Sequence, residues 1–261
     1  MNYFRIVYSY LQYRRNAVDA FGVHAPFLFD LLQDVVYQKS DPKDFAEIEQ
    51  LRRRLLNTNS TIRVQDFGAG SRADKGGERK LSRITKYSSK PFKFTALIYR
   101  LIKYFQPQQI LEIGTSFGIS TMYMAKANSK AKISTMEGCP ETAAIAQQNF
   151  DVMKMKNIEL IEGNFDTLLP PFLAANQSMD FVFFDGNHRK EPTLRYFNSC
   201  IEKAHSETVF IFDDIHWSEG MEEAWEEIKK DSRTKLCLDF YSIGIVFFKK
   251  ELTKESFNIK F

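Results

Sequence analysis

The sequence predicts an α/β fold in which a doubly wound, mostly parallel sheet of seven strands ends in an antiparallel hairpin and follows a mostly helical N-terminal extension. Three observations lead to this prediction. From about residue 92, short apolar runs alternate with amphipathic helical patterns, which is typical of a parallel sheet wound with helices. Residues 181–184 (FVFF) and 209–212 (VFIF) are continuously apolar, as strands buried on both faces are. The last two strand-like runs are joined by a turn too short for a crossover helix.

The repeating part of the chain accounts for most of the expected elements. We expect parallel strands at residues 109–113, 132–137, 158–162, 180–185 and 208–213, and the hairpin at residues 235–241 and 244–249. The helices between them are expected at residues 118–127, 140–153, 165–173, 191–204 and 219–229.

The first 90 residues have a different pattern. Helical segments are expected at about residues 3–20, 26–38 and 43–57, followed by a strand-like run at residues 62–67. A loop rich in Gly, Lys and Arg comes next, and a helix at residues 91–105 introduces the repeating part. We therefore predict an N-terminal, mostly helical extension, residues 1–90, that covers part of the active site, and a second domain, residues 91–261.

Composition narrows the class of protein. The chain has 261 residues, 44% of them hydrophobic, with 36 Lys and Arg against 33 Asp and Glu, which excludes intrinsic disorder and a collagen-like repeat. Its three cysteines are widely spaced without a C-x-x-C pair, which favours reduced thiols in a cytoplasmic protein over a disulfide scaffold. No stretch reaches the roughly 18 apolar residues of a membrane span, so we expect no membrane partner. The apolar N-terminus is interrupted by Arg5 and is expected to be an amphipathic helix rather than a signal peptide.

A glycine turn follows the first parallel strand, in residues 110–118 (ILEIGTSFG). Gly114 allows a sharp turn, and Gly118 allows an adenosine-type ligand and the start of the helix to approach closely. A tight strand-to-helix turn would explain the glycines by itself. Glu137, about 20 residues further on, ends the next strand where an acid can accept both ribose hydroxyls, and this favours a nucleoside site. Asn164 then follows the third strand, beside the expected position of an adenine ring.

These segments resemble class I S-adenosylmethionine-dependent methyltransferases. The resemblance covers about residues 92–250 and depends on LEIGTSFGIS, the acid of MEG, EGNF, FVFFDGNH and the reversed terminal hairpin. The resemblance is greatest for small-molecule O-methyltransferases. Their glycine motif often contains Thr and Ser, and the motif in this chain contains Thr115 and Ser116. An antiparallel last strand marks this Rossmann-like methyltransferase fold and disfavours an NAD-dependent dehydrogenase.

The resemblance implies a cofactor and the residues that bind it. S-adenosyl-L-methionine would lie along the glycine turn, with Glu112 and Gly114 near its methionine part, Glu137 near the ribose and Asn164 near the adenine. The complete set of expected cofactor-binding residues is Glu112, Gly114, Thr115, Ser116, Gly118, Glu137, Gly138, Asn164, Phe165 and Asp185.

Three carboxylates come at the ends of the fourth and fifth parallel strands, namely Asp185, Asp213 and Asp214. The carboxyl ends of adjacent parallel strands converge, and carboxylates that meet there repel one another unless a proton, a hydrogen bond or a cation intervenes. Mg²⁺ or another divalent cation would relieve the repulsion and lower the pKa of a substrate hydroxyl. The pattern is similar to catechol-type O-methyltransferases, in which an Asp and an Asp-Asn pair hold the metal, although the pair here is Asp-Asp. Without a metal, Asp185 would position cofactor or substrate, and Asp213 or Asp214 would cap the next helix.

Two histidines, His188 and His216, follow these carboxylates by two or three residues. Each is a candidate general base or substrate contact, and the alternative for each is a hydrogen-bonding role in the scaffold. We expect the catalytic residues among Asp185, His188 and His216. The strings DGNH and DDIHWS look more like predicted sugar- and antibiotic-type O-methyltransferases than like catechol enzymes. Trp217 is expected either above the adenine or substrate pocket or in the core.

A second glycine cluster, residues 64–70, lacks the following apolar helix and strand-ending acid, so we do not expect it to bind the cofactor. It lies in a basic segment, residues 63–93, which holds nine basic and three acidic side chains, whereas the rest of the chain holds 27 basic and 30 acidic ones. This segment could contact phosphate, an anionic acceptor or RNA, or it could be a solvated loop.

The sequence therefore predicts a cytoplasmic S-adenosylmethionine-dependent transferase that methylates a hydroxyl of a small molecule, with an anionic acceptor and a homodimer left open. An RNA or protein methyltransferase that uses residues 63–93 is the alternative, but the fourth strand ends in DGNH and aromatic and basic residues do not interleave as in an RNA-binding module. A non-catalytic S-adenosylmethionine-binding protein is the alternative outside enzymes.

Overall fold

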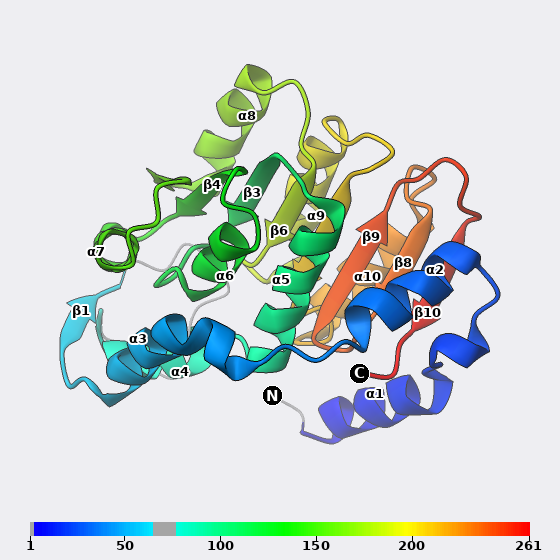
Figure 1. Cartoon of the computed structure of the whole chain (residues 1–261), viewed down its shortest axis with the longest axis horizontal. Coiled ribbons are helices and arrows are strands. Elements are labelled where there is room, and N and C mark those ends of the chain that lie inside the picture. Colours follow the sequence, from blue (N-terminus) through cyan, green and yellow to red (C-terminus); the bar gives the residue numbers. More distant parts are fainter. Residues whose placement is uncertain (1–2, 65–76) are drawn as a thin grey trace. The chain divides into compact units, whose positions relative to one another are not determined.

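The computed structural model describes residues 3–64 and 77–261 of the chain. Figure 1 shows the helices and strands, coloured along the sequence. The chain divides into two compact units. We call the one formed by Met1–Gln38 and Phe172–Phe261 the terminal unit, and the one formed by Lys39–Pro171 the central unit.

The terminal unit contains five strands in the order β6-β7-β9-β8-β10, with the bounds β6 Phe181–Phe184, β7 Val209–Asp213, β9 Ile243–Phe247, β8 Leu236–Asp239 and β10 Glu255–Asn258. Strand β7 is parallel to β6, β9 is antiparallel to both β7 and β8, and β10 is parallel to β8. Strands β6 to β9 are buried throughout, as their continuous apolar runs require. The helices of the unit are α1 (Tyr3–Asn16), α2 (Pro26–Leu31), α9 (Lys190–Ile201) and α10 (Glu219–Lys230).

Helix α10 shows why these residues form a helix. Ser218 caps its start by accepting a hydrogen bond from the Met221 backbone N–H at 3.2 Å, acids occupy its first turn and lysines its last. Its buried side chains recur at helical spacing, namely Met221, Ala224, Trp225 and Ile228. A Cβ at Gly244 of β9 would lie 2.6 Å from the Trp225 ring, so only glycine lets this indole pack on the strand.

The central unit contains three parallel strands in the order β3-β4-β5, with the bounds β3 Gln109–Ile113, β4 Lys132–Glu137 and β5 Ile158–Glu162. Helices α5 (Phe92–Phe105), α6 (Ile119–Ala127), α7 (Pro140–Val152) and α8 (Phe165–Ala175) alternate with these strands, and α8 continues past the unit boundary. Helix α3 (Ala46–Asn57), helix α4 (Leu81–Ser88) and the antiparallel pair β1 (Thr61–Arg63) and β2 (Glu78–Lys80) come before them. A buried aromatic cluster around Phe45 and Tyr123 joins the first part of this unit to α6.

The predicted α/β class, the parallel strands alternating with helices and the antiparallel hairpin are confirmed. In the described part of the chain, eight strands, β3 to β10, correspond to the predicted seven. The additional strand is β10, which pairs with the outer edge of β8. Glu255–Asn258 is short, with two exposed and two half-buried residues, so it carries little strand pattern of its own and forms by pairing with β8.

The N-terminal segments differ from the predicted helices in their ends. The first helix stops at Asn16 instead of residue 20, because Asp19 accepts a hydrogen bond from the Phe21 N–H at 3.1 Å and caps a short 3₁₀ turn, Ala20–Gly22. Helix α2 ends at Leu31 and continues as a π-helical turn, Leu32–Val36. Strand β1 ends at Arg63, Val64 is not part of a strand, and residues 65–67 of the expected strand lie outside the described residues. None of the helices in the described part of the chain has the length and apolar character needed to cross a bilayer.

Candidate functional site

The glycine turn after β3 has the sharp, left-handed backbone that its sequence predicts. Gly114 and Gly118 have φ angles of 106° and 79°, and Ser116 between them has a φ of 49°. A Cβ at Gly118 would lie 2.3 Å from the Phe150 ring, which is closer than two carbon atoms can approach without displacement of the ring. Glycine at position 118 is therefore required both by the backbone and by the packing of α7 against the turn.

Glu112 is fully buried beneath this turn, and neutral hydroxyl groups surround its carboxylate. Ser120 and Thr135 each donate to it at 2.6 Å, and the Thr121 hydroxyl donates as well. The Thr115 hydroxyl lies 2.6 Å from that of Thr135 and extends the network to the turn. Burial raises the pKa of Glu112 to about 7, although the three hydroxyl donors oppose the rise. The carboxylate thus ties β3, β4 and α6 together, and its expected contact with the methionine part of the cofactor stays a prediction.

Glu137 ends β4 and is held by backbone amides. One oxygen accepts from the Ser116 N–H at 2.8 Å and the other accepts from the Cys139 N–H at 2.9 Å. Burial raises the pKa of Glu137, and the amide donors partly offset this rise. The backbone N–H groups of Gly138 and Thr115 also act on this carboxylate. Its predicted role of accepting a pair of ribose hydroxyls stays a prediction.

The turn after β5 uses Asn164 as a helix cap. Its side-chain oxygen accepts from the Asp166 N–H at 2.9 Å, and Gly163 before it has a φ of 141°. Asn164 is exposed, whereas Phe165 is half-buried at the first position of α8 and Gly138 is buried after β4. The structure thus places the expected adenine-side residues in the central unit, at the carboxyl ends of β4 and β5.

The terminal unit brings a second group together after β6 and β7. One ligand atom each of Asp185, His188 and Asp213 lies within 4.8 Å of the others, and His188 Nε2 is 3.8 Å from Asp185 Oδ1. Asp213 is buried, and the other two side chains are partly exposed. The expected metal set contained Asp214 in place of His188. Asp214 follows the last residue of β7 and has a left-handed φ of 53°, and among the described residues it does not join this group.

Two carboxylates and an imidazole form a donor set that suits a divalent cation. Carboxylate oxygens bind Mg²⁺ and Mn²⁺, and an added imidazole nitrogen shifts the preference toward Mn²⁺, Fe²⁺ or Zn²⁺. The residues present therefore fit a metal ion, with a more mixed set of ligand atoms than three carboxylates would provide.

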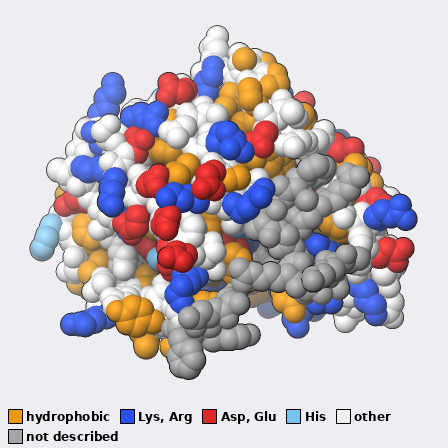
Figure 2. All heavy atoms as spheres, turned by 180° about the vertical axis from the view of Figure 1, so that it is seen from behind, with side chains coloured by type: hydrophobic (Ala, Val, Ile, Leu, Met, Phe, Trp, Pro, Cys, Tyr) orange, Lys and Arg blue, Asp and Glu red, His pale blue; other side chains and the backbone are white. Residues whose placement is uncertain are grey.

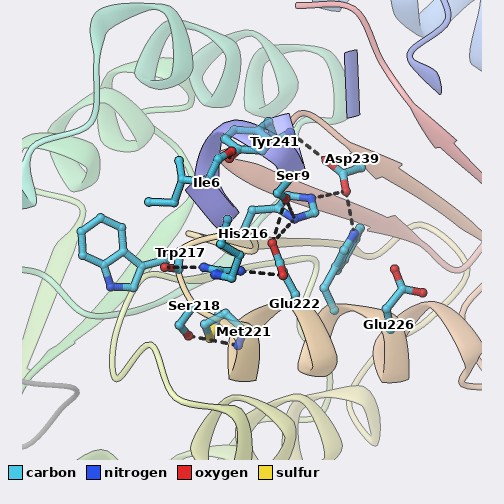
Figure 3. Close-up of polar contacts among 12 residues, drawn as sticks. Ile6, Ser9, His216, Trp217, Ser218, Met221, Glu222, Glu226, Asp239 and Tyr241 are labelled. Atoms are coloured by element: carbon cyan, nitrogen blue, oxygen red, sulfur yellow. Dashed lines mark hydrogen bonds and ion pairs between the residues drawn. The ribbon is translucent and has the colours of Figure 1, made fainter. Parts of the chain in front are cut away.

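His216 has partners other than those of His188, and Figure 3 shows the side chains around His216. Its Nε2 lies 2.7 Å from Asp239 Oδ2, its Nδ1 lies 3.2 Å from Glu222 Oε1, and its ring stacks on Tyr241 with the planes 12° apart. Burial lowers the pKa of His216, but the hydrogen bonds and charges of Asp239 and Glu222 outweigh burial and raise it overall. Because both ring nitrogens face carboxylates, His216 is poorly placed to take a proton from an acceptor.

Sequence reasoning missed the partners of these residues. Asp239 and Glu222 around His216 were not predicted, nor were the hydroxyls of Ser120, Thr121 and Thr135 around Glu112. One signal was available for Asp239, because it is an acid inside the apolar run LCLDF, where an unpartnered charge is costly. Trp217 is 44% exposed, so of its two expected positions the core is wrong.

The basic segment is only partly described. The second glycine cluster lies outside the described residues except for Val64, and so do Arg72 and Lys75. The described basic residues Arg79 and Lys80 lie on β2, and Arg83 and Lys86 lie on α4. On the face shown in Figure 2, the described Lys and Arg side chains are interspersed with Asp and Glu side chains.

Comparison with known proteins supports the methyltransferase resemblance. Residues 111–215 match a family model described as a methyltransferase domain. A catechol O-methyltransferase of Niastella koreensis is 30% identical over 126 residues, which cover 47% of this chain and 55% of that protein. A catechol O-methyltransferase of Mycobacterium tuberculosis is 31% identical over 131 residues, which cover 49% of this chain and 56% of that protein. An SAH-bound methyltransferase structure from Podospora anserina has a TM-score of 0.61 at 15% identity and covers 82% of this chain and 91% of its own.

The matched segment is similar to a methyltransferase domain and the fold is similar to that of a solved methyltransferase, so the resemblance predicted from the motifs is confirmed. The matched residues run from β3 to the loop after β7 and contain the glycine turn, Glu137 and Asp185. The chain spans about half the length of the curated relatives that it matches, both of which are catechol O-methyltransferases.

Proposed function

We propose that this protein transfers a methyl group from S-adenosylmethionine to a hydroxyl oxygen of a small molecule. The observation that carries the proposal is the match of residues 111–215 to a methyltransferase domain, since this segment holds both Glu137 with its amide-bound carboxylate and the group of Asp185, His188 and Asp213. The catechol O-methyltransferase relatives support oxygen as the acceptor atom.

In the proposed reaction the acceptor oxygen forms a bond to the methyl carbon while the carbon–sulfur bond breaks and its electron pair stays on sulfur. When bound, S-adenosylmethionine supplies an already activated methyl group, so the chain mainly has to orient the reactants and remove the hydroxyl proton. Glu137 would accept the ribose hydroxyls, and the glycine turn would lie against the methionine part. His188 would take the proton, and Asp185, 3.8 Å from its ring, would stabilise the resulting imidazolium.

A divalent cation held by Asp185, His188 and Asp213 is the second form of this proposal. The cation would lower the pKa of an acceptor hydroxyl, and His188 would then be a ligand instead of a base. Mn²⁺ is a suitable probe because it accepts both oxygen and nitrogen ligands. If EDTA leaves methyl transfer unchanged, His188 is the base; if EDTA stops it and Mn²⁺ restores it, the three residues are ligands.

Calorimetry tests the cofactor directly. The folded protein should bind S-adenosylmethionine and not NAD, and Glu137→Gln should weaken binding, because a neutral amide accepts fewer hydroxyl hydrogen bonds than a carboxylate does. Glu141→Gln on the nearby α7 is a control, since this side chain accepts a hydrogen bond from the Arg63 N–H at 2.6 Å and has no expected cofactor contact. Lack of S-adenosylmethionine binding by folded protein would refute the proposal.

The acceptor can then be sought with catechol and a labelled methyl donor, followed by a metabolite extract. An anionic acceptor that uses residues 63–93, a homodimer, a cytoplasmic location and the division of the chain at residue 90 stay predictions.

A further inference from the structure

The loop between β7 and α10, residues 214–218, is fixed at two consecutive residues by other elements of the terminal unit. His216 is held through its side chain, and the carbonyl oxygen of Trp217 accepts a hydrogen bond from Arg5 Nη2 at 3.2 Å. Figure 3 shows how side chains from α1, from α10 and from the end of β8 converge on this loop. We call Arg5, Ser9, His216, Glu222 and Asp239 the loop clamp.

Helix α1 contributes Arg5 and Ser9 to the loop clamp, and more than 200 residues of sequence separate them from Glu222. Arg5 Nη1 donates to Glu222 Oε2 at 2.6 Å, and the Ser9 hydroxyl donates to Glu222 Oε1 at 2.8 Å. That same Oε1 faces His216 Nδ1. Glu222 therefore links α1 to the imidazole through one carboxylate.

Asp239 forms the opposite, buried side of the loop clamp. Asp239 is 2% exposed, and its Oδ2 accepts from Trp225 Nε1 at 3.1 Å as well as facing His216. Its Oδ1 accepts from the Tyr241 N–H at 2.7 Å, and the Tyr241 hydroxyl donates to the Ile6 carbonyl of α1 at 3.0 Å. Asp239 thus has a fixed partner on each oxygen, and Tyr241 connects it back to α1.

Stability alone is a weak explanation of the contact between Arg5 and Glu222. The side chains of Arg5 and Glu222 are each 27% exposed, and partly exposed ion pairs contribute little to the free energy of unfolding. A network of directed hydrogen bonds does fix geometry, which apolar packing does less sharply. The loop that it fixes starts directly after Asp213, one of the three residues gathered at the ends of β6 and β7.

We propose that Arg5 and His216 are positioning residues, through which α1 holds residues 214–218 in place and orients Asp213 toward Asp185 and His188. The inference rests on the proposed function for its catalytic consequence. It also explains a histidine that comes three residues after Asp213 in the sequence but whose ring nitrogens both face other partners.

Trp217 offers a direct measurement of the loop. The other tryptophan, Trp225, is 1% exposed, so acrylamide quenching of the intrinsic fluorescence reports mainly on Trp217. Arg5→Gln and His216→Leu should raise the quenching constant toward that of a fully exposed tryptophan. His216→Gln should stay close to the unchanged protein, because its amide nitrogen can donate to Asp239 from the position of Nε2.

The chain offers matched controls for both changes. Arg15→Gln removes an arginine from the last turn of the same helix, and His205→Leu breaks another His–Asp pair of the terminal unit, with His205 Nε2 2.8 Å from Asp180 Oδ1. Neither control should change the quenching of Trp217. Circular dichroism shows whether each variant is folded. If His216→Leu does not fold, Arg5→Gln still tests the inference.

Kinetics with catechol and S-adenosylmethionine give the second readout. Arg5→Gln and His216→Leu should lower kcat roughly 10-fold to 100-fold, as expected when reacting groups are displaced by about 1 Å. The KM for S-adenosylmethionine should stay the same, because its expected binding residues, apart from Asp185, lie in the central unit.

Two outcomes decide the inference. If Arg5→Gln and His216→Leu quench like the two controls, or if they raise KM without lowering kcat, the positioning role is refuted. If the unchanged protein transfers no methyl group but the contrast in Trp217 quenching is seen, the proposed function is wrong while the hold of α1 on the loop is supported.

Discussion

The loops after β6 and β7 carry the same short pattern, an aspartate followed three residues later by a histidine, yet the structure uses the two histidines differently. His188 remains beside Asp185 and Asp213, with its Nε2 3.8 Å from Asp185. His216 instead turns to Glu222 and Asp239 and stacks on Tyr241. Local spacing is thus not sufficient to assign a catalytic histidine, because partners distant in sequence decide what each ring nitrogen can do.

Two buried carboxyl groups, one in each unit, also differ in their partners. Glu112 in the central unit is surrounded by neutral hydroxyls, and its pKa rises to about 7. Asp239 in the terminal unit instead faces an imidazole, an indole N–H and a backbone amide. Each acid is buried, but only Asp239 has a partner that can carry a positive charge.

The first prediction has the largest expected effect, and it compares aspartates at the two ends of β6 by the rate of methyl transfer. Asp185→Asn should lower the rate of methyl transfer roughly 1000-fold, because it removes a charge that either binds a cation or stabilises the base. Asp180→Asn, at the start of β6 and paired with His205, should leave the rate within a few-fold. Equal losses in the two variants would show that the carboxyl end of the strand has no special role.

The second prediction tests the environment of Asp239. Asp239→Asn should lower the free energy of unfolding at pH 7 by about 3 kcal/mol, because the His216 imidazole loses its charged partner inside the protein. Glu226→Gln on α10 is the control: this side chain is 52% exposed and pairs with Lys229, so its change should cost less than about 0.5 kcal/mol. Urea unfolding measures both, and a neutral Asp239→Asn would contradict the assigned role.

The third prediction compares the two histidines directly. His188→Gln should lower kcat about 100-fold, as expected for loss of a general base, whereas His216→Gln should lower it only a few-fold. The reverse result would make His216 the base and overturn the distinction between the loops.

The smallest effect concerns the pH dependence of stability. Because the pKa of Glu112 is higher in the folded protein, at about 7, than its ordinary value of 4.5, the folded state binds more protons between these values and stability falls as pH rises through them. The loss is on the order of 1–3 kcal/mol. Glu112→Gln should remove this part of the slope between pH 5 and pH 8, measured by urea unfolding.

A matched change checks the sign of that slope. Lys132 Nζ lies 2.8 Å from a carboxylate oxygen of Glu159 on β5 and lowers the pKa of Glu159. A lowered pKa has the opposite effect on the pH dependence of stability, so Glu159→Gln should not reduce the loss of stability at higher pH. An unchanged slope in Glu112→Gln would mean that the hydroxyl donors keep Glu112 ionised throughout.

Much of the central unit could be predicted from local sequence. The strands β3, β4 and β5 have the bounds that their apolar runs predict, and Gly118 needs its left-handed backbone for the reason that the turn suggests. Strand β10 could not be predicted in this way, because its four residues form a strand only by pairing with β8. The end of the first helix was missed because the Asp19 side chain, rather than a break in the helical pattern, sets the next turn.

Local sequence is sufficient to predict the α/β class, the glycine turn, the acid at the end of β4 and the aspartates at the ends of β6 and β7, because each depends on residues close together in the chain. Tertiary contacts are needed to show that His188 joins Asp185 and Asp213 and that His216 does not. Arg5 meets Glu222 across 217 positions of sequence, and no periodicity records such a contact. Periodic patterns report which face of an element is buried, whereas hydrogen bonds between side chains depend on which distant elements become neighbours when the chain folds.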